Sequence, residues 1–465
     1  MTVESSPPWG LRWRSSQSFV ITTATLSLFS ECFLFGFIVP ILPHMLEVRL
    51  HQDPSRTQSF TTTLLTLYGL ISLVSAPVIA HFADQTPSRK TPLLLSLFAC
   101  ASGTILVAAA PTVWALLTGQ VLQALASSSV WIVGFATLAD NVEGDNKGRV
   151  LGTTMAIVGT GVFAGPMVSG ILLQLLGYWP AWSAALLLLA VDFVARLVMI
   201  DNRSPAETAT ATATTTTTEP EEQTALLSSE ISDSHDTPDK SVPASGFYRI
   251  MLGNAQVVAS LFNALSTALI LSAFDTTLPL HVRDVFSWGS LPVGILFLGL
   301  QAPSVVLGAP IGWLRDRIGL RWPTTVGWAM MIPLLWLLAI PGETFFWGRL
   351  QHGGEVVYIL AIVGLGFAFA LIRGSSTLQM MAVVHDLESK NPKIFGPYGG
   401  NSRLSSMTEI PINVGMMLGP LLSGTVAEFI GYFYMNTAFA IVALLVAVSS
   451  WVYITAAPKQ EEAAV

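Results

Sequence analysis

The stretch Gly161-Val-Phe-Ala-Gly165-Pro166-Met-Val-Ser-Gly170 returns late in the chain as Gly415-Met-Met-Leu-Gly419-Pro420-Leu-Leu-Ser-Gly424. Both stretches read G-x3-G-P-x3-G and lie inside apolar runs. A second related pair, residues 80–90 and 312–321, keeps the same order, and each member holds an acid followed by basic residues. Two matches in one order predict a chain built from two duplicated halves.

The composition around these repeats is that of a membrane protein. The chain has 465 residues, of which 52% are hydrophobic and 11% charged, against about 25% charged in a soluble domain. This excludes a soluble enzyme and a disordered scaffold. A helix that crosses a bilayer needs about 20 mostly apolar residues, and twelve such runs begin near Phe19, Phe60, Pro92, Thr112, Arg149, Trp179, Ile250, Leu291, Trp322, Glu355, Arg403 and Tyr432.

We therefore expect an all-α polytopic membrane protein with twelve transmembrane helices in two pseudo-symmetric six-helix bundles. The expected divisions are an N-terminal tail (1–18), an N-terminal bundle (19–200), a linker (201–247), a C-terminal bundle (248–456) and a C-terminal tail (457–465). The linker contains the Thr-rich run Thr208–Thr218 and holds nine acids and two bases between Asp201 and Ser245, which accounts for the net charge of −7. It is too polar to offset its ordering entropy, so we expect it to be disordered.

The loop charges predict the orientation. With both termini and the linker on one side, 16 of the 22 Lys and Arg residues lie there, and four, Arg49, Arg56, Arg283 and Arg349, lie on the other side. Basic loops stay in the cytoplasm, so both termini and the linker are predicted to be cytoplasmic.

The sequence predicts no metal site and no cofactor. The two cysteines, Cys32 and Cys100, lie in apolar runs, and the seven histidines show no ligand spacing. Outside the acidic linker the charges balance, so nucleic acid is not an expected partner.

At these motifs the sequence resembles the major facilitator superfamily. The loops around Asp84 and Asp316 are similar to its G-x3-D-R-x-G-R signature, and the repeated Gly-Pro stretch is similar to the motif of its antiporter branch. Ser30–Pro43 and Thr408–Gly415 resemble the first and eleventh helices of drug–proton antiporters and vesicular amine transporters, with the acids Glu31 and Glu409 in place. Departures from that branch are Gln120 in place of an Arg, Tyr68 in place of a Lys, Gly374 in place of an acid, and Ala80 in place of the first glycine of the loop signature.

The candidate proton- or substrate-binding residues are Glu31, Asp275, Arg373, Glu409 and Gln120. A charge at the bilayer centre costs about 2.5–3.5 kcal/mol on insertion scales, so it normally faces a partner or a water-filled cavity. Burial raises the pKa of a carboxyl group and a nearby cation lowers it, so such an acid can exchange a proton for a cationic substrate. The acids can instead serve only as interhelical hydrogen-bond partners, and Arg373 is either the structural partner of an acid or an anion contact.

The remaining motif residues have structural or gating interpretations. Asp192 and Arg196 are four residues apart on one helix and are predicted to form a structural ion pair. A cytoplasmic latch is expected from Asp84, Arg89, Lys90, Asp316, Arg317 and Arg321, whose acids can accept hydrogen bonds at a helix N-terminus. The helix-bend motif comprises Gly161, Gly165, Pro166, Gly170, Gly415, Gly419, Pro420 and Gly424, and it either packs helices or also seals a leak pathway.

The resemblance implies a monomeric secondary transporter that exports an amphipathic, cationic small molecule, as multidrug efflux proteins do, in exchange for protons by alternating access. Its expected location is the plasma membrane or a vesicular or vacuolar membrane, and its partners are the substrate, protons and lipid. An uncoupled facilitator of the same fold remains open because of Gln120. A membrane-embedded enzyme would need a nucleophile–base set or metal cluster that the sequence does not show, and a non-transporting sensor is a further alternative.

The linker composition gives a first prediction. Shortening Thr208–Thr218 should leave transport nearly intact, since loop-closure entropy changes by only about 0.6 kcal/mol per doubling of length. The measurement is substrate flux at matched membrane insertion. Complete loss of flux would mean that this segment binds or regulates something.

Overall fold

The computed structural model describes residues 11–85, 90–135, 137–138, 147–199, 244–342, 354–390 and 401–454. Their regular elements are all helical. The long helices of the first half are α2 (Gln17–His44), α3 (Thr57–Gln85), α4 (Lys90–Ala108), α5 (Val113–Ser129), α7 (Lys147–Leu175) and α8 (Tyr178–Val198). Those of the second half are α11 (Ala255–Phe286), α12 (Ser290–Val306), α13 (Gly308–Ile318), α14 (Arg321–Ala339), α16 (Gly354–Ile372), α18 (Asn401–Phe429) and α19 (Tyr432–Tyr453).

Shorter elements join or flank these helices. They are α1 (Leu11–Arg14), α10 (Ala244–Leu252), α17 (Ser375–Lys390), the π-helical turns η1 (Met45–Arg49) and η3 (Val130–Gly134), and the 3-10 turn η2 (Pro54–Arg56). α10 begins at Ala244, inside the stretch assigned to the linker. The Thr-rich run and most of that stretch lie outside the described residues.

The membrane-spanning character predicted from the sequence is confirmed. Eleven helices of the described residues are long and apolar enough to cross a membrane, and α12 with α13 forms a bent pair that brings the number to twelve. The bend of 48° follows Pro303, whose ring cannot pack against a regular preceding turn. Eleven of the twelve predicted runs begin within about one turn of the helix observed, and α11 begins at Ala255, five residues after the predicted Ile250.

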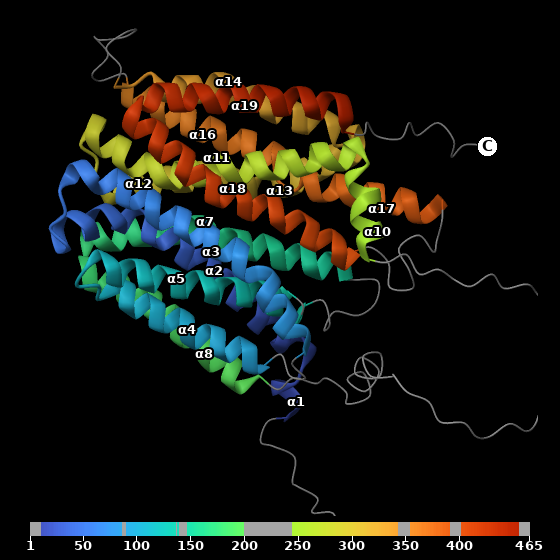
Figure 1. The fold of residues 1–465 in the computed structure, drawn as a ribbon, viewed down its shortest axis with the longest axis horizontal. Helices are drawn as coiled ribbons and strands as arrows, with labels where there is room; N and C mark the ends of the chain where they lie inside the picture. Colours follow the sequence, from blue (N-terminus) through green and yellow to red (C-terminus); the bar gives the residue numbers. More distant parts are fainter. Residues whose placement is uncertain are drawn as a thin grey trace, which may run out of the picture.

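The two halves use the same helix pairs, and Figure 1 shows them as lower (blue to green) and upper (yellow to red) layers. In the first half α2 packs on α7, and α4 packs on α5 and α8. In the second half the equivalent pairs are α11 with α18, and α14 with α16 and α19. The halves meet along two seams, α7 against α12 and α3 against α18.

The repeated Gly-Pro motif explains how these contacts become so close. A Cβ atom on Gly161 would lie 3.0 Å from the Cys32 Cβ, and one on Gly165 would collide with the Phe33 carbonyl oxygen. The first two glycines of the motif therefore let α7 approach the backbone of α2. Gly415 and Gly419 do the same for α18 against α11.

The third glycine of each motif faces the other half. A Cβ on Gly170 would collide with the Ser290 carbonyl oxygen of α12, and one on Gly424 would collide with the Thr62 side chain of α3. Each motif thus joins two helices within its own half and then one helix across a seam. α7 and α18 continue as helices through Pro166 and Pro420, so the proposed sealing bend remains a prediction.

The bundle has two unlike ends. We call the end where α2 begins and α19 finishes the terminal end, and the end where α2 finishes at His44 the opposite end (Figure 1). The hydrogen bonds between described residues of the two halves lie at or near the opposite end: Gln58 Nε2 donates to the Thr276 carbonyl (3.4 Å), Ser290 Oγ to the Gly170 carbonyl (3.2 Å) and the Leu291 amide to Gln174 Oε1 (2.8 Å). An ion pair between Glu47 and Arg283 joins the halves at the same end.

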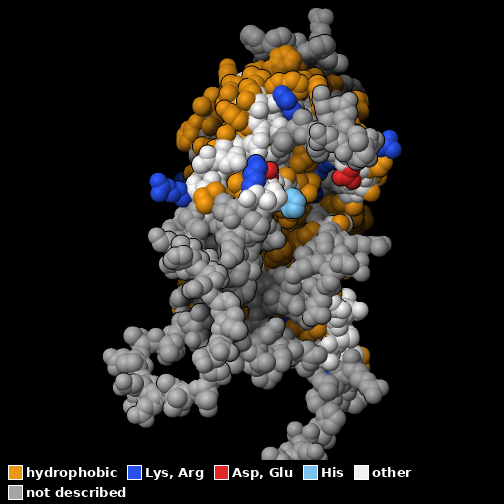
Figure 2. Space-filling view, turned by 90° about the vertical axis from the view of Figure 1, so that its right-hand side faces the viewer, with side chains coloured by type: hydrophobic (Ala, Val, Ile, Leu, Met, Phe, Trp, Pro, Cys, Tyr) orange, Lys and Arg blue, Asp and Glu red, His pale blue; other side chains and the backbone are white. Residues whose placement is uncertain are grey.

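The terminal end, by contrast, is hollowed. Figure 2 looks onto this end and shows a recess at mid-height, between the two layers of Figure 1, with apolar side chains on its walls. Among the described residues, the hydrogen bonds and the ion pair that join the two halves therefore gather at the opposite end.

The glycine contacts lead to a stability prediction. Gly165→Ala should lower the thermal unfolding temperature of the detergent-purified protein, because overpacking a tight contact costs about 1–3 kcal/mol. Gly159→Ala is the matched control on the same helix, since its Cβ would meet nothing within 4 Å. Equal unfolding temperatures for the two variants would contradict this packing role.

Candidate functional site

Glu31 lies near the middle of α2 and points into the first half. Its side chain is buried, at 5% exposure. Cys100 of α4 and Ser127 of α5 lie near its carboxyl group, and Arg196 and Asp192 of α8 act on it electrostatically. The carboxyl group is therefore enclosed by four helices of one half.

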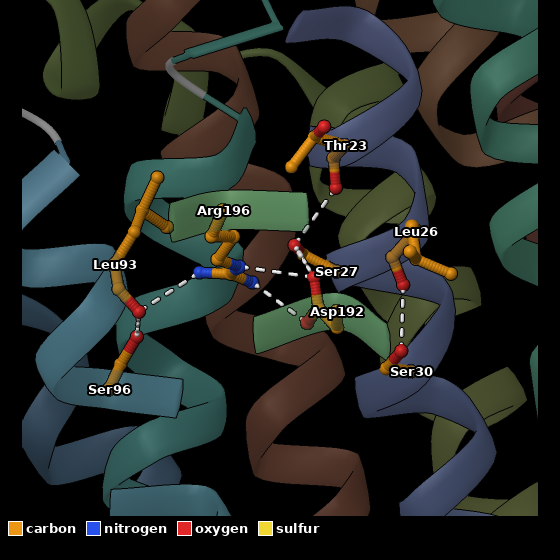
Figure 3. Close-up of polar contacts among 8 residues, drawn as sticks. All are labelled: Thr23, Leu26, Ser27, Ser30, Leu93, Ser96, Asp192 and Arg196. Atoms are coloured by element: carbon orange, nitrogen blue, oxygen red, sulfur yellow. Dashed lines mark hydrogen bonds and ion pairs between the residues drawn. The ribbon is translucent and has the colours of Figure 1, made fainter. Parts of the chain in front are cut away.

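Asp192 and Arg196 form a fully buried ion pair beside it, drawn in Figure 3. Arg196 Nε and Nη2 donate to the two carboxylate oxygens of Asp192 at 3.2 and 3.4 Å, and Nη1 donates to the Leu93 carbonyl of α4 at 3.0 Å. Ser27 of α2 donates to Asp192 Oδ1 at 2.6 Å. Each side chain of the pair is 1% exposed, so this network ties α2, α4 and α8 together.

The charges of this group do not cancel. Arg196 has both oxygens of Asp192 as partners, and its remaining contact is a backbone carbonyl. Glu31 is the second acid near one base. If all three groups are ionised, the buried group holds one excess negative charge, which burial in the membrane makes costly.

Cys32 follows Glu31 on α2 and packs against Gly161 of α7 and the apolar cluster around Leu28 in the first half. Its thiol is half-buried, and Arg373 and Glu409 of the second half act on it electrostatically, as does Glu31. Cys32 therefore marks the place where charges of both halves come near one another.

Arg373 occupies the break between two helices. α16 ends at Ile372, Gly374 takes the left-handed conformation (φ 80°), and α17 begins at Ser375. Arg315 of α13 donates to the Leu371 and Arg373 carbonyl oxygens at 2.7 and 2.8 Å. A cation at a helix C-terminus is favourable, so Arg315 holds Arg373 at the end of α16.

Glu409 lies in the first part of α18 and is exposed. Lipid is an expensive surrounding for a carboxylate. Glu409 also acts electrostatically on Cys32 of the other half. We therefore infer that its exposed carboxylate faces the first half and not lipid. Glu31, Arg373 and Glu409 thus all lie around Cys32.

Asp275 and Gln120 lie away from this group. Asp275 is half-buried on α11 and precedes Thr276, whose carbonyl accepts from Gln58 at the closed seam. Gln120 is 1% exposed on α5, seven residues and so about two turns from Ser127. Its Oε1 is buried without a hydrogen-bond partner among the described residues.

The expected latch is described only in part. Arg89 lies outside the described residues, and the side chains of Asp84 and Lys90 are not described. In the second half, Asp316 is exposed, while Arg317 stacks on Trp313 (4.2 Å) and Arg321 on Trp451 (4.2 Å). The latch role of these residues remains a prediction.

Several residues of the site carry no recognisable signal in the sequence. Arg315 was not among the expected latch residues, and Ser127 and Ser27 are ordinary small polar residues of apolar helices. In the sequence Tyr68 stands out only as a replacement for a Lys, yet it is 6% exposed and lies near Glu31, Ser127 and both cysteines. Contacts between helices, which no spacing rule gives, decide these roles.

Comparison with known protein families shows to which family the chain belongs. The profile described as the Major Facilitator Superfamily matches residues 24–396. The chain belongs to this superfamily. It is a membrane transporter of this class, with an uncharacterised relative in Schizosaccharomyces pombe that is 29% identical over 94% of both chains.

Other relatives and structures agree with this assignment. The MFS-type transporter ppzB of Metarhizium rileyi is 25% identical over 96% of this chain and 97% of its own length. The class C tetracycline resistance protein of Escherichia coli is 28% identical over 37% of this chain and 42% of its own. The fold matches the nucleoside transporter NupG with a TM-score of 0.63 at 14% identity, covering 93% of this chain and 98% of that one. It also matches the human organic anion transporter MFSD10 with a TM-score of 0.59 at 16% identity, covering 96% and 100%.

The two cysteines provide a test of the site geometry. A small, charged thiol reagent should modify half-buried Cys32 and leave Cys100, which is 1% exposed, unmodified in the folded protein. Mass spectrometry of the native protein measures this directly. Cys32→Ser should abolish labelling and Cys100→Ser should preserve it. Equal labelling of both thiols would contradict the difference in exposure between Cys32 and Cys100.

Proposed function

We propose that this transporter exports a small amphipathic cation in exchange for protons by alternating access. The observation that carries the proposal is the buried group of two acids and one base at Glu31, Asp192 and Arg196. Its excess negative charge can be balanced by a proton on Glu31 or by a cationic substrate nearby. Because one charge serves for either ligand, binding of one favours release of the other, which is the thermodynamic basis of exchange.

The second half contributes two charged groups near Cys32, the carboxylate of Glu409 and the guanidinium of Arg373. Glu409 offers a negative charge to a cation in the recess, while Arg373 either keeps an acid ionised until substrate arrives or contacts an anionic part of it. Apolar walls at the open end (Figure 2) suit an amphipathic molecule. Asp275 and Gln120 are proposed to act at a different stage, after the substrate has moved toward the opposite end.

The direction of transport follows from two arguments. The excess of basic residues in terminal-end loops favours a cytoplasmic location for that end, and the recess opens there. A site loaded from the cytoplasm and emptied on the other side exports its substrate. The distant likeness to tetracycline resistance proteins supports export as well.

A second candidate function is uncoupled facilitated diffusion by the same fold. Gln120 favours it, because an uncharged amide stands where related antiporters carry Arg. In that case the acids bind the cation but do not exchange protons for it. Whether uphill transport depends on a pH gradient separates the two functions.

The test is uphill accumulation of a fluorescent amphipathic cation, ethidium, in proteoliposomes with an imposed pH gradient. Glu31→Gln and Glu409→Gln should abolish gradient-driven accumulation, because a neutral amide mimics a permanently protonated acid, while downhill exchange can persist. Glu31→Asp should keep coupling but shift its pH optimum, since it changes reach and keeps the titratable group.

Asp192→Asn is the matched control within the same buried network. We assign it to structure, so it should lower the yield of folded protein more than it lowers coupling. If both glutamine variants still concentrate ethidium, the proton role of these acids is wrong. Uncoupled facilitated diffusion is supported only if accumulation of ethidium by the unmutated protein is also independent of the pH gradient.

A further inference from the structure

A groove runs along the second half between α12 and α16. It encloses about 650 Å³, which is within the range of small-molecule binding sites. Its fourteen lining residues are aliphatic, aromatic, proline or glycine. α16 is long and apolar enough to cross a membrane, and so is α12 together with α13. The groove therefore lies in the hydrocarbon part of the bilayer, where an occupant must be apolar.

The exposures along α12 show that the groove opens toward lipid. α7 contacts α12 at Gly294, and Phe297 and Leu300 belong to the buried core of the bundle. Ile295 and Val306 line the groove and are 51% and 73% exposed. They lie about 100° and 120° around the helix from Gly294, at 3.6 residues per turn. The groove thus faces away from both the seam and the core.

The contact between α12 and α16 makes the groove narrow. A Cβ atom on Gly366 would lie 2.6 Å from the Gly299 carbonyl oxygen and 2.9 Å from Pro303 Cγ, so the helices touch at the floor of the groove. From Pro292 to Val306 the groove follows α12 for about 21 Å, which gives it a mean width of about 6 Å. Carbon atoms in contact are about 3.5–4.0 Å apart, so the groove accommodates one hydrocarbon chain but not two side by side.

A carboxylate and an aromatic ring lie where the groove reaches the opposite end. Trp288 lines this part of the groove, and its ring packs on Phe286 with 4.9 Å between centroids. α16 begins against Phe286, because a Cβ on Gly354 would be 3.7 Å from its ring. Glu355 follows Gly354, is half-buried, and lies one turn before the lining residue Ile359 on the same side of α16.

These two side chains indicate the head group of the occupant. An aromatic face attracts a quaternary ammonium, and a carboxylate attracts the same charge and repels an anion. A long hydrocarbon chain with an ammonium at its polar end is the chemistry of a choline phospholipid. The length of the groove also exceeds one leaflet, about half of a 30 Å hydrocarbon core, so a full-length acyl chain can lie in it.

We propose that this groove binds one acyl chain of a choline phospholipid and that the choline ammonium lies at Trp288 and Glu355. The chain then fills the space beside the bend between α12 and α13, in contact with Pro303 and Leu307. The site is separate from the buried charges at Glu31, so it applies equally to an exchanger and to a facilitator.

The test is photo-crosslinking of phosphatidylcholine to the full chain in lipid nanodiscs, with adducts located by mass spectrometry. The diazirine is placed either near the ester or near the methyl end of one acyl chain. The first lipid should label the segment around Trp288 and Pro292, and the second should label the segment around Ala302 and Val306. Equal labelling of the exposed faces of α8 and α19 would mean general contact with lipid and would overturn the site.

Ala302→Phe tests the groove by filling it. It should reduce groove adducts by about tenfold, the loss expected when about two CH₂ groups of the chain lose their apolar contact. Ala190→Phe is the matched control, because it makes the same change at an exposed position of α8 outside the groove. It should leave the adducts unchanged. Equal labelling of both variants, at equal unfolding temperatures, contradicts the site, and the adduct map of the unmutated protein tests it even if Ala302→Phe fails to fold.

Competition with unlabelled lipids of identical chains tests the head group. Phosphatidylcholine should displace the photoreactive lipid about threefold better than phosphatidylglycerol, the range for an exposed charge or cation–π contact. Glu355→Gln should remove this preference. Asp53→Asn, which removes an exposed carboxylate from the same end of the first half, should keep it.

Two results would overturn the choline assignment. They are equal competition by the two lipids in the unmutated protein and an unchanged preference in Glu355→Gln. Displacement of the photoreactive lipid by ethidium would assign the groove to the transported cation instead. The readout needs neither flux nor a pH gradient, so failure of the Glu31 experiment would leave this result intact.

Discussion

The cost of placing charge in hydrocarbon constrains every polar feature of this bundle. Arg196 satisfies that constraint with two oxygens of Asp192 and one backbone carbonyl, all buried. Glu409 satisfies it differently, by facing the space between the halves. Glu31 lies between these cases, because it is enclosed yet shares its one nearby base with another acid. In the exchange that we propose, its charge depends on whether a proton or a cationic substrate is bound.

The duplicated halves share their helix packing but differ in their buried polar residues. Gly165 and Gly419 bring equivalent helices into backbone contact, and Gly170 and Gly424 repeat the contact across the two seams. Among the described residues of the second half, no fully buried ion pair like that of Asp192 and Arg196 occurs. There the interior between α11, α16 and α19 holds aromatic rings, with His281 stacked on Tyr432 at 3.6 Å between centroids. Symmetric packing thus supports an asymmetric site, in which one half holds the buried charges and the other contributes groups at the recess.

The two ends of the bundle differ in how the described residues of the two halves are joined. At the opposite end the seams contain glycines, hydrogen bonds and one ion pair, so the halves touch closely. At the terminal end the helices end in loops and in the extra helices α10 and α17, whose buried side chains, with those of α11 and α18, form a separate small core. The second half therefore has packing of its own at that end and does not rely on the first half for it. Rocking of one half on the other needs this kind of independence.

The sequence by itself determined the architecture. Twelve apolar runs, a repeated Gly-Pro motif and a polar break were enough to predict two six-helix bundles, because hydrophobic length and helix-packing motifs are local properties. It also indicated Glu31, Arg373 and Glu409, since a charge in an apolar run stands out, and the four-residue spacing of Asp192 and Arg196. Only the tertiary structure decided that Glu31 lies beside that pair, that Asp275 lies apart at the closed end, and that Glu47 contacts Arg283 across the halves. These facts depend on helix rotation and on contacts between residues that are up to 236 positions apart, and one-dimensional periodicity specifies neither.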